Sequence, residues 1–388
     1  MRAYVLGAGA SHPMYPLGSG LFEDIDNHIR DCGPCFNRFD YQKDWPKLKE
    51  WLENNQNPLL RQAYRNGNIE QIFTTLDLAE MLISESHISM LRASKEGEAV
   101  VKAAIGNHDI FANEIGEYRD ARSKLLWAME HYFLYRNQRD QQDYKSEQWQ
   151  YLKRFGNLVK SGDVVITFNY DSTVERVLLD LGKWAPGDGY GTELVFQQDR
   201  HDKTRVNFPQ SMVKVLHLHG AIGWYSKPPF GQDFDLSAEG GGFITRDALS
   251  PAPLETEIAL DPLLLHGLGI YNVDASLPQR PPDEYQIMLH PSFLKEYGGE
   301  DRRNQVFNRL WRMASNALKD AEEVVVIGYS LPPADSAAWT LLHTNCTQGQ
   351  TTIVNPSKSV LMNRYGNLLK LPAFTPAMNF GTWLDSQD

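Results

Sequence analysis

The stretch Arg2-Ala3-Tyr4-Val5-Leu6-Gly7-Ala8-Gly9-Ala10-Ser11 decides the fold. Residues 2–7 form a short apolar run that ends in glycine, which is typical of a buried parallel strand that meets a tight turn. Glycines at such a turn let the backbone approach a pyrophosphate, and the helix that follows directs its N–H groups at the phosphates. His12 replaces the third glycine of the usual pattern, and Pro13 and Pro16 delay the helix, so a tight turn without a ligand is the alternative interpretation.

Four further apolar runs resemble the first and are also expected to be strands. They are residues 163–169, 212–219, 322–328 and 351–355. Each run is followed by residues that can open a helix or a loop, and strands that alternate with helices over this length indicate βαβ units. The expected fold is therefore α/β: a Rossmann-like parallel sheet with helices on both faces and an inserted helical module.

The long segment between the first two strands has a helical character. Residues 69–78 and 121–133 repeat apolar side chains at three- and four-residue spacing, whereas strand-like alternation is sparse. We therefore predict a first part of the core at 1–40, the inserted helical module at 41–157, and a second part of the core with long loops at 158–388. The module serves either as structural cover or as a lid or oligomer surface.

Composition sets the class of protein. The 388 residues are 42% hydrophobic and 22% charged, which is ordinary for a globular protein. The net charge of −11 makes direct nucleic-acid binding unfavourable, although a helix N-terminus can hold the pyrophosphate of NAD without a lysine. No apolar stretch approaches the roughly 18–20 residues of a membrane span. We expect no membrane association.

The three cysteines point to a reduced compartment. They are Cys32, Cys35 and Cys346, too few for a disulfide framework, so we expect a cytoplasmic protein. The Cys32–Cys35 pair is half of a zinc site, but no second cysteine or histidine pair follows it. Two ordinary thiols in a turn are therefore favoured, and no metal is expected.

The second expected strand ends in residues suited to sugar chemistry. In Thr167-Phe168-Asn169-Tyr170-Asp171, an asparagine amide at a strand end can orient a water or a ribose hydroxyl. Asp171 either locks the rotamer of that amide or caps the next helix. A dehydrogenase would place an acidic residue after a second strand about 20 residues beyond the glycines, and Asp24 and Asp26 lie near that distance in a helical pattern. That function is therefore disfavoured.

The third expected strand ends in His217-Leu218-His219-Gly220. His219 can accept a proton from a ribose hydroxyl near neutral pH, whereas His217, further into the sheet, is expected to be a satisfied core residue. A metal site at this pair lacks a third ligand at suitable spacing. Gly328 and Ser330 follow the fourth strand and Asn355 ends the fifth, each either near a ligand or in a plain turn or cap.

Taken in order, five motifs resemble the signature of the sirtuin superfamily and, more closely, its bacterial sirtuin-like NADase branch of antiphage defence. The motifs are GAGAS (7–11), TFNYD (167–171), LHG (218–220), IGYSL (327–331) and VN (354–355). Two departures from the deacylase pattern are the segment 12–17, which replaces Asp-Phe-Arg, and the absence of the four zinc cysteines. Both weaken a peptide-deacylase interpretation and leave NAD cleavage intact.

The resemblance implies a role for each matched residue. Asn169, Asp171 and His219 would be the catalytic residues. The residues expected to bind the dinucleotide are Gly7, Ala8, Gly9, Ala10, Ser11, Thr167, Gly328, Ser330 and Asn355. NAD would be the substrate, cleaved to nicotinamide and to ADP-ribose or its cyclic form.

The resemblance also implies an assembly, because unregulated NAD hydrolysis would poison a cell. We expect a homo-oligomer and a separate partner, a HerA-type hexameric ATPase, since no sensor domain is evident after the core. Two alternatives stay open: an NAD-dependent protein deacylase, and a sensor that binds NAD or ADP-ribose without turnover.

Overall fold

A computed structural model describes the fold of most of the chain. The described residues are 1–31, 41–83, 108–139, 145–191, 195–197, 205–206, 209–226, 243–245, 258–260, 286–288, 302–332, 335–369 and 377–387. Cys32 and Cys35, half of the disfavoured zinc site, lie outside these residues. Within the described ranges, no three histidine, cysteine, aspartate or glutamate side chains cluster closely enough to hold a metal.

All five expected strands form, and they build one parallel sheet. They are β1 (Arg2–Leu6), β2 (Val164–Thr167), β5 (Lys214–His217), β10 (Glu323–Ile327) and β11 (Thr351–Val354). Their order across the sheet is β11-β10-β1-β2-β5, and every neighbouring pair is parallel. The strands are short and almost wholly buried, because helices cover both faces of such a sheet.

The strand order is that of a Rossmann-like fold with its first strand at the centre. The chain moves outward from β1 through β2 to β5, then returns to the other side of β1 as β10 and β11. The direction reverses between β1 and β10, and ligands of open α/β sheets collect beyond the carboxyl ends of the strands at this point.

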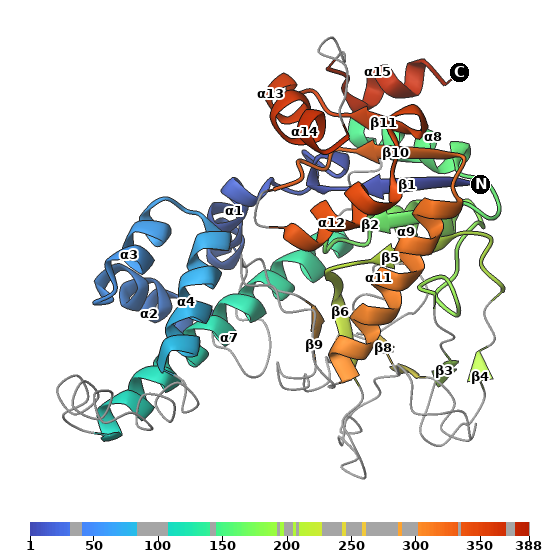
Figure 1. Cartoon of the computed structure of the whole chain (residues 1–388). Coiled ribbons are helices and arrows are strands. Elements are labelled where there is room, and N and C mark those ends of the chain that lie inside the picture. The colour runs from blue at the N-terminus through green and yellow to red at the C-terminus, as the bar shows by residue number, and fades with distance from the viewer. Residues whose placement is uncertain are drawn as a thin grey trace, which may run out of the picture. The chain divides into compact units, whose positions relative to one another are not determined.

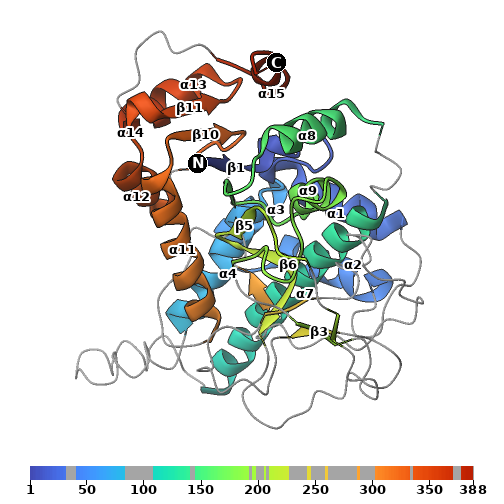
Figure 2. The same ribbon diagram turned by 90° about the vertical axis from the view of Figure 1, so that its right-hand side faces the viewer.

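Two groups of helices flank the sheet, as expected. Figure 2 shows α11 (Arg302–Asp320) and α12 (Ser336–Asn345) on one side of the strands and α8 (Glu147–Leu158) and α9 (Thr173–Asp180) on the other. The C-terminal elements are η4 (Gln348–Gln350), α13 (Lys358–Val360), η5 (Leu361–Tyr365), α14 (Gly366–Leu369) and α15 (Phe380–Asp385). Contacts join α15 to α8 and α14 to α12, so the end of the chain adds to both groups.

A second, antiparallel sheet was not expected from the sequence. It consists of β4 (Arg205–Val206), β3 (Val195–Gln197), β7 (Phe243–Thr245), β8 (Ile258–Leu260), β6 (Gly220–Ser226) and β9 (Gln286–Met288) in that order. The second part of the core, 158–388, was expected to carry long loops between the strands of the parallel sheet, and this expectation is wrong where these strands occur. Most of them are only two or three residues long, too short to show an alternating pattern among glycines and prolines.

The helical insertion forms a compact unit of its own. The chain divides into one unit of residues 1–17, 133–289 and 296–388 and a second of 18–132 and 290–295. The helices that begin in the second unit are α1 (Gly18–Asp31), α2 (Tyr41–Asn54), α3 (Pro58–Arg65), α4 (Ile69–Ile83) and α7 (His108–Arg139), which Figure 1 labels. No helix among the described residues is long and apolar enough to cross a membrane.

The bounds of the insertion differ from the expected 41–157 at both ends. Helix α1 contacts α2 and α4, so it belongs with the helical unit. Helix α8 contacts α9 and α15, so it belongs with the parallel sheet. Neither assignment follows from helical periodicity, because periodicity reports that a helix has a buried face and not which neighbour covers it.

Candidate functional site

The glycine loop packs directly against the loop that follows β10. Gly7 N donates to Ile327 O at 3.0 Å, and Gly9 N donates to Gly328 O at 3.0 Å. A Cβ on Gly7 would lie 2.4 Å from Tyr329 Cα, and one on Gly328, whose φ is +63°, would lie 2.4 Å from Ala10 N. These glycines are therefore required by the contact between two backbones, a reason that the sequence interpretation did not include.

The helix after the glycine loop begins late, as Pro13 and Pro16 predict. A short 3-10 helix, η1 (Ala8–Ala10), follows β1, and α1 begins only at Gly18. The side chain of Gln148 on α8 donates to Ala10 O, so the glycine loop is held from a second side. Ala8 is exposed, whereas Ser11 is 3% exposed.

The amide of Asn169 is fixed against the glycine loop. Asn169 Nδ2 donates to Gly7 O at 3.1 Å and to Ser11 Oγ at 3.2 Å. Because a peptide carbonyl can only accept, the NH₂ group must face Gly7, and the amide oxygen Oδ1 is turned the other way. Asn169 therefore holds a hydrogen-bond acceptor in a defined orientation at the end of β2.

Ser11 connects this amide to Asp171. Its hydroxyl accepts from Asn169 and donates to Asp171 Oδ1 at 3.2 Å, and the same carboxyl oxygen accepts from Thr173 N at 3.1 Å. Asp171 thus reaches the Asn169 amide through Ser11, and it bonds the first residue of α9, whose N-cap is Ser172. Burial raises the pKa of the Asp171 carboxyl, partly offset by the hydrogen bonds from Thr173 and Ser11.

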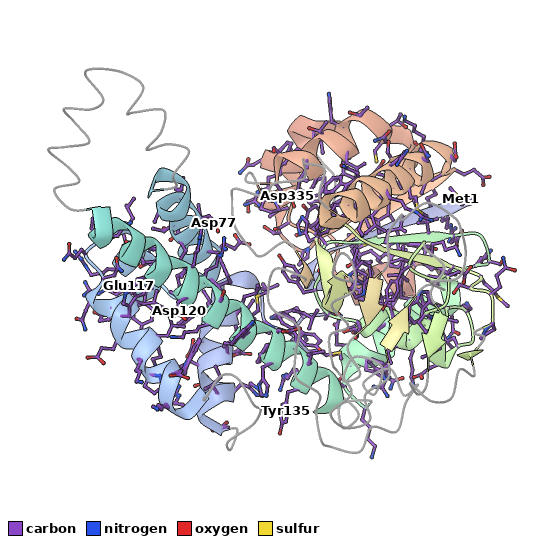
Figure 3. All side chains as sticks on the ribbon, turned by 90° about the horizontal axis from the view of Figure 1, so that it is seen from below. Met1, Asp77, Glu117, Asp120, Tyr135 and Asp335 are labelled. Atoms are coloured by element: carbon purple, nitrogen blue, oxygen red, sulfur yellow. The ribbon has the colours of Figure 1, made fainter. Side chains whose placement is uncertain are left out.

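His219 is paired with an aspartate that the sequence analysis did not assign. Asp335 Oδ2 lies 3.0 Å from His219 Nε2 and accepts from Tyr329 OH at 2.7 Å, and both His219 and Asp335 are buried. Asp335, labelled in Figure 3, also caps α12, where Ala338 N donates to its Oδ1 at 3.4 Å. The carboxylate makes Nε2 the protonated nitrogen of neutral His219, so Nδ1 is the nitrogen that can take up a proton.

One signal in the sequence could have identified Asp335. It is the acidic residue at the start of the helix after β10, and the loops beyond parallel strands meet at one edge of the sheet. A helix cap was a sufficient explanation for such a residue, and the capping bond does exist. The second carboxyl oxygen, which the cap does not use, carries the bond to His219.

Aromatic side chains bring the strand ends of Asn169 and His219 together. The ring of Phe168 stacks on Tyr329, with centroids 4.2 Å apart, and its edge meets the His219 ring at 5.0 Å. The Tyr170 ring lies 6.3 Å from the same histidine. Both neighbours of Asn169 in the chain therefore contact His219, as expected for residues just beyond the paired ends of β2 and β5.

The remaining expected site residues have clear structural contacts. Thr167 Oγ1 accepts from Asn169 N at 3.1 Å, so this hydroxyl shapes the strand end. Asn355 Oδ1 accepts from Ser357 N at 2.9 Å, which makes a turn after β11. Ser330 is exposed, and its carbonyl accepts from Arg364 at 2.6 Å.

Neither kind of comparison with known proteins gave a match: no protein-family model fits this chain, and no curated protein resembles it significantly.

Proposed function

We propose that this protein is an NAD⁺ glycohydrolase, which cleaves the nicotinamide–ribose bond to give nicotinamide and ADP-ribose. The observation that carries this function is the pairing of His219 with Asp335 beside the strand end that fixes the Asn169 amide. Both groups lie at the carboxyl edge of the sheet, next to the position where the strand order reverses. The ordered motifs that resemble sirtuin-like NADases support the same function.

The chemistry requires few groups from the protein. Loss of nicotinamide leaves positive charge on the ribose, so a site must orient the sugar, direct a water and accept one proton. In this proposal Asn169 Oδ1 accepts a hydrogen bond from the attacking water or a ribose hydroxyl. His219 Nδ1 accepts the proton, and the Asp335 carboxylate stabilises the imidazolium that forms. One water is consumed for each NAD⁺ cleaved, and one proton is released.

The glycine loop would hold the pyrophosphate of the substrate in place. Residues 7–11 lie at the end of β1 beside the reversal of strand order, where open α/β sheets bind dinucleotide phosphates. Gly328, Ser330 and Asn355 would then lie along the adenosine half. The net charge of −11 favours backbone N–H groups as phosphate ligands. The exposed Ala8 would supply one, since the N–H groups of the other four residues of this loop donate to backbone oxygens.

Regulation is proposed to come from assembly. By the same resemblance, the enzyme would act in the cytoplasm as a homo-oligomer with a HerA-type hexameric ATPase, and NAD depletion would serve antiphage defence. Size measurement of the purified chain, alone and with such an ATPase, checks this part. A fully active monomer that ignores the ATPase would contradict it.

The test of the activity is a product assay. Purified protein is incubated with NAD⁺, with and without the ATPase, and nicotinamide and ADP-ribose are separated and quantified. The expected result is equimolar release of both products, which His219→Ala abolishes. Release of nicotinamide only in the presence of an acyl-lysine peptide would identify a deacylase, and binding without turnover would identify a sensor.

A further inference from the structure

A buried ion pair stands directly behind Asn169. His217 at the end of β5 and Glu175 on α9 are both fully buried. His217 Nε2 lies 2.6 Å from Glu175 Oε1, and His217 Nδ1 lies 3.0 Å from the backbone oxygen of Asn169. One imidazole therefore bridges α9 to the backbone of the residue whose amide faces the glycine loop.

The partners determine the protonation of this imidazole. The Asn169 carbonyl can only accept, so Nδ1 must carry a proton. Burial lowers the pKa of His217, but the charge and hydrogen bond of Glu175 and the bond to Asn169 outweigh it, so the pKa is raised. Tyr190 OH donates to the same Glu175 oxygen at 3.3 Å. The raised pKa and the two acceptors together favour the imidazolium form of His217.

The Asn169 carbonyl lies beyond the end of the strand pairing. The register of β2 with β5 ends at Thr167 and His217, and the chain continues with Leu218 N donating to Thr167 O at 3.0 Å. At the Asn169 carbonyl, two residues after Thr167, the His217 side chain takes the place of a backbone donor. The direction of the β2 end therefore depends on that side chain.

Stability alone is a weak reason for such a pair. The cost of removing two charges from water commonly equals or exceeds their attraction, and apolar replacements of similar volume are often at least as stable. What this pair does supply is a charge-assisted hydrogen bond to one defined backbone oxygen. Bonds of this kind restrict geometry, which matters where a catalytic group must be held accurately.

We infer that His217 and Glu175 are positioning residues, which hold the Asn169 backbone so that its side-chain amide faces the reacting ribose. This inference rests on the proposed NAD⁺ hydrolysis. His217 and Glu175 would then belong to the site without touching the substrate, because they act through Asn169. His217 was expected to be a buried core residue with its hydrogen bonds satisfied, and its burial and two hydrogen bonds confirm this expectation.

Two substitutions of the same histidine separate positioning from simple packing. In His217→Asn the side-chain amide nitrogen replaces Nδ1, so the bond to Asn169 O is kept and the bond to Glu175 is lost. In His217→Gln the amide nitrogen replaces Nε2, so the bond to Glu175 is kept and the bond to Asn169 is lost. Both variants remove the ring and one charge, and thermal melting of each shows whether it is folded.

The expected result is a difference in kcat between the two variants. His217→Gln should lose about tenfold or more in kcat with KM little changed, because the catalytic amide is displaced and not the binding loop. His217→Asn should retain more of the wild-type kcat than His217→Gln, because it keeps the bond to Asn169 and loses only the support from Glu175. Equal losses in the two variants, or a larger loss in His217→Asn, would overturn the inference.

The wild-type protein tested in parallel separates two kinds of failure. If wild-type protein releases no nicotinamide, with or without the ATPase, the proposed function fails and the positioning role fails with it. If wild-type protein is active and His217→Gln matches it, only the positioning role fails. Glu175→Gln is a conservative variant that should restore part of the function. Its amide can donate to Nε2 of a neutral His217 whose proton is on Nδ1, so the bond to Asn169 is kept. Glu175→Gln should therefore retain more activity than Glu175→Leu.

Discussion

Replacing Asp335 with asparagine is expected to slow NAD⁺ cleavage strongly while leaving the fold intact. The change removes one charge 3.0 Å from His219 Nε2 and keeps a side chain of the same shape. Asparagine caps helices as well as aspartate does, so the bond from Ala338 N to residue 335 is retained. Because an amide has only one oxygen, its NH₂ group then takes the place of Oδ2, and the Tyr329 hydroxyl accepts from it instead of donating. The loss should therefore fall on the proton-accepting step.

The magnitude follows from the distance. Unit charges 3.0 Å apart attract by about 5.5 kcal/mol at an effective dielectric constant of about 20, once His219 is protonated. The amide offers no charge to the imidazolium, but the carboxylate no longer has to be desolvated, so the net loss is about 2–4 kcal/mol. At 1.36 kcal/mol for each factor of ten, kcat should fall by about 30-fold to 1000-fold.

The assay is nicotinamide release at saturating NAD⁺, with melting temperature as the check on folding. Tyr329→Phe is the matched control, because it removes the other bond to Asp335 Oδ2 and keeps both the carboxylate and the ring stacked on Phe168. The control should lose less than Asp335→Asn. If Asp335→Asn stays within about threefold of wild type, below 1 kcal/mol, the carboxylate does not assist His219. If the two variants lose the same activity, the effect lies in the loop and not in the charge.

Two further substitutions test the scaffold. Burial raises the pKa of Asp171, so wild-type folding gains stability below the raised pKa and loses it as the pH rises through it. The side chain in Asp171→Asn can still accept from Ser11 but carries no charge at any pH. The melting temperature of the variant minus that of wild type should therefore be larger at about pH 8 than at about pH 4, and a difference that does not change with pH would refute this. Gly328→Ala places a Cβ 2.4 Å from Ala10 N at a φ of +63°, and should lower the urea-unfolding free energy by about 2–4 kcal/mol. Gly349→Ala, whose Cβ meets open space, should change it by less than about 1 kcal/mol, and equal effects would contradict the close packing.

The strands of the parallel sheet could be predicted because each is a short, largely apolar run that ends in glycine or a polar residue. Residues 2–7 and 322–328 are of this kind, and both form strands within one residue of the expected bounds at each end. The short strands of the second sheet could not be predicted, since a segment of three residues such as Phe243–Thr245 is too short to show the alternation of apolar and polar residues that distinguishes a strand from a loop. Their position depends on pairing with segments distant in the chain.

The site was predicted to the extent that its residues end strands. Asn169 and His219 follow β2 and β5 directly, and parallel strands bring their carboxyl ends to one edge. Glu175 could not be assigned to the site, because it lies within a helix and its partner is set by the tertiary fold. The position of Asp335 after β10 pointed to this edge of the sheet, but a helix cap was a sufficient explanation for it. The glycines were predicted for a phosphate, whereas the structure gives them a contact with residues 328–329 that requires glycine by itself.

The most direct test is a crystal structure of the His219→Ala variant with NAD⁺ bound. It should show the pyrophosphate against residues 7–11 and the nicotinamide ribose between the Asn169 amide and residue 219. A dinucleotide bound elsewhere, or oriented with its adenine beside Asn169, would contradict the assignment of these strand ends to the bond that is cleaved.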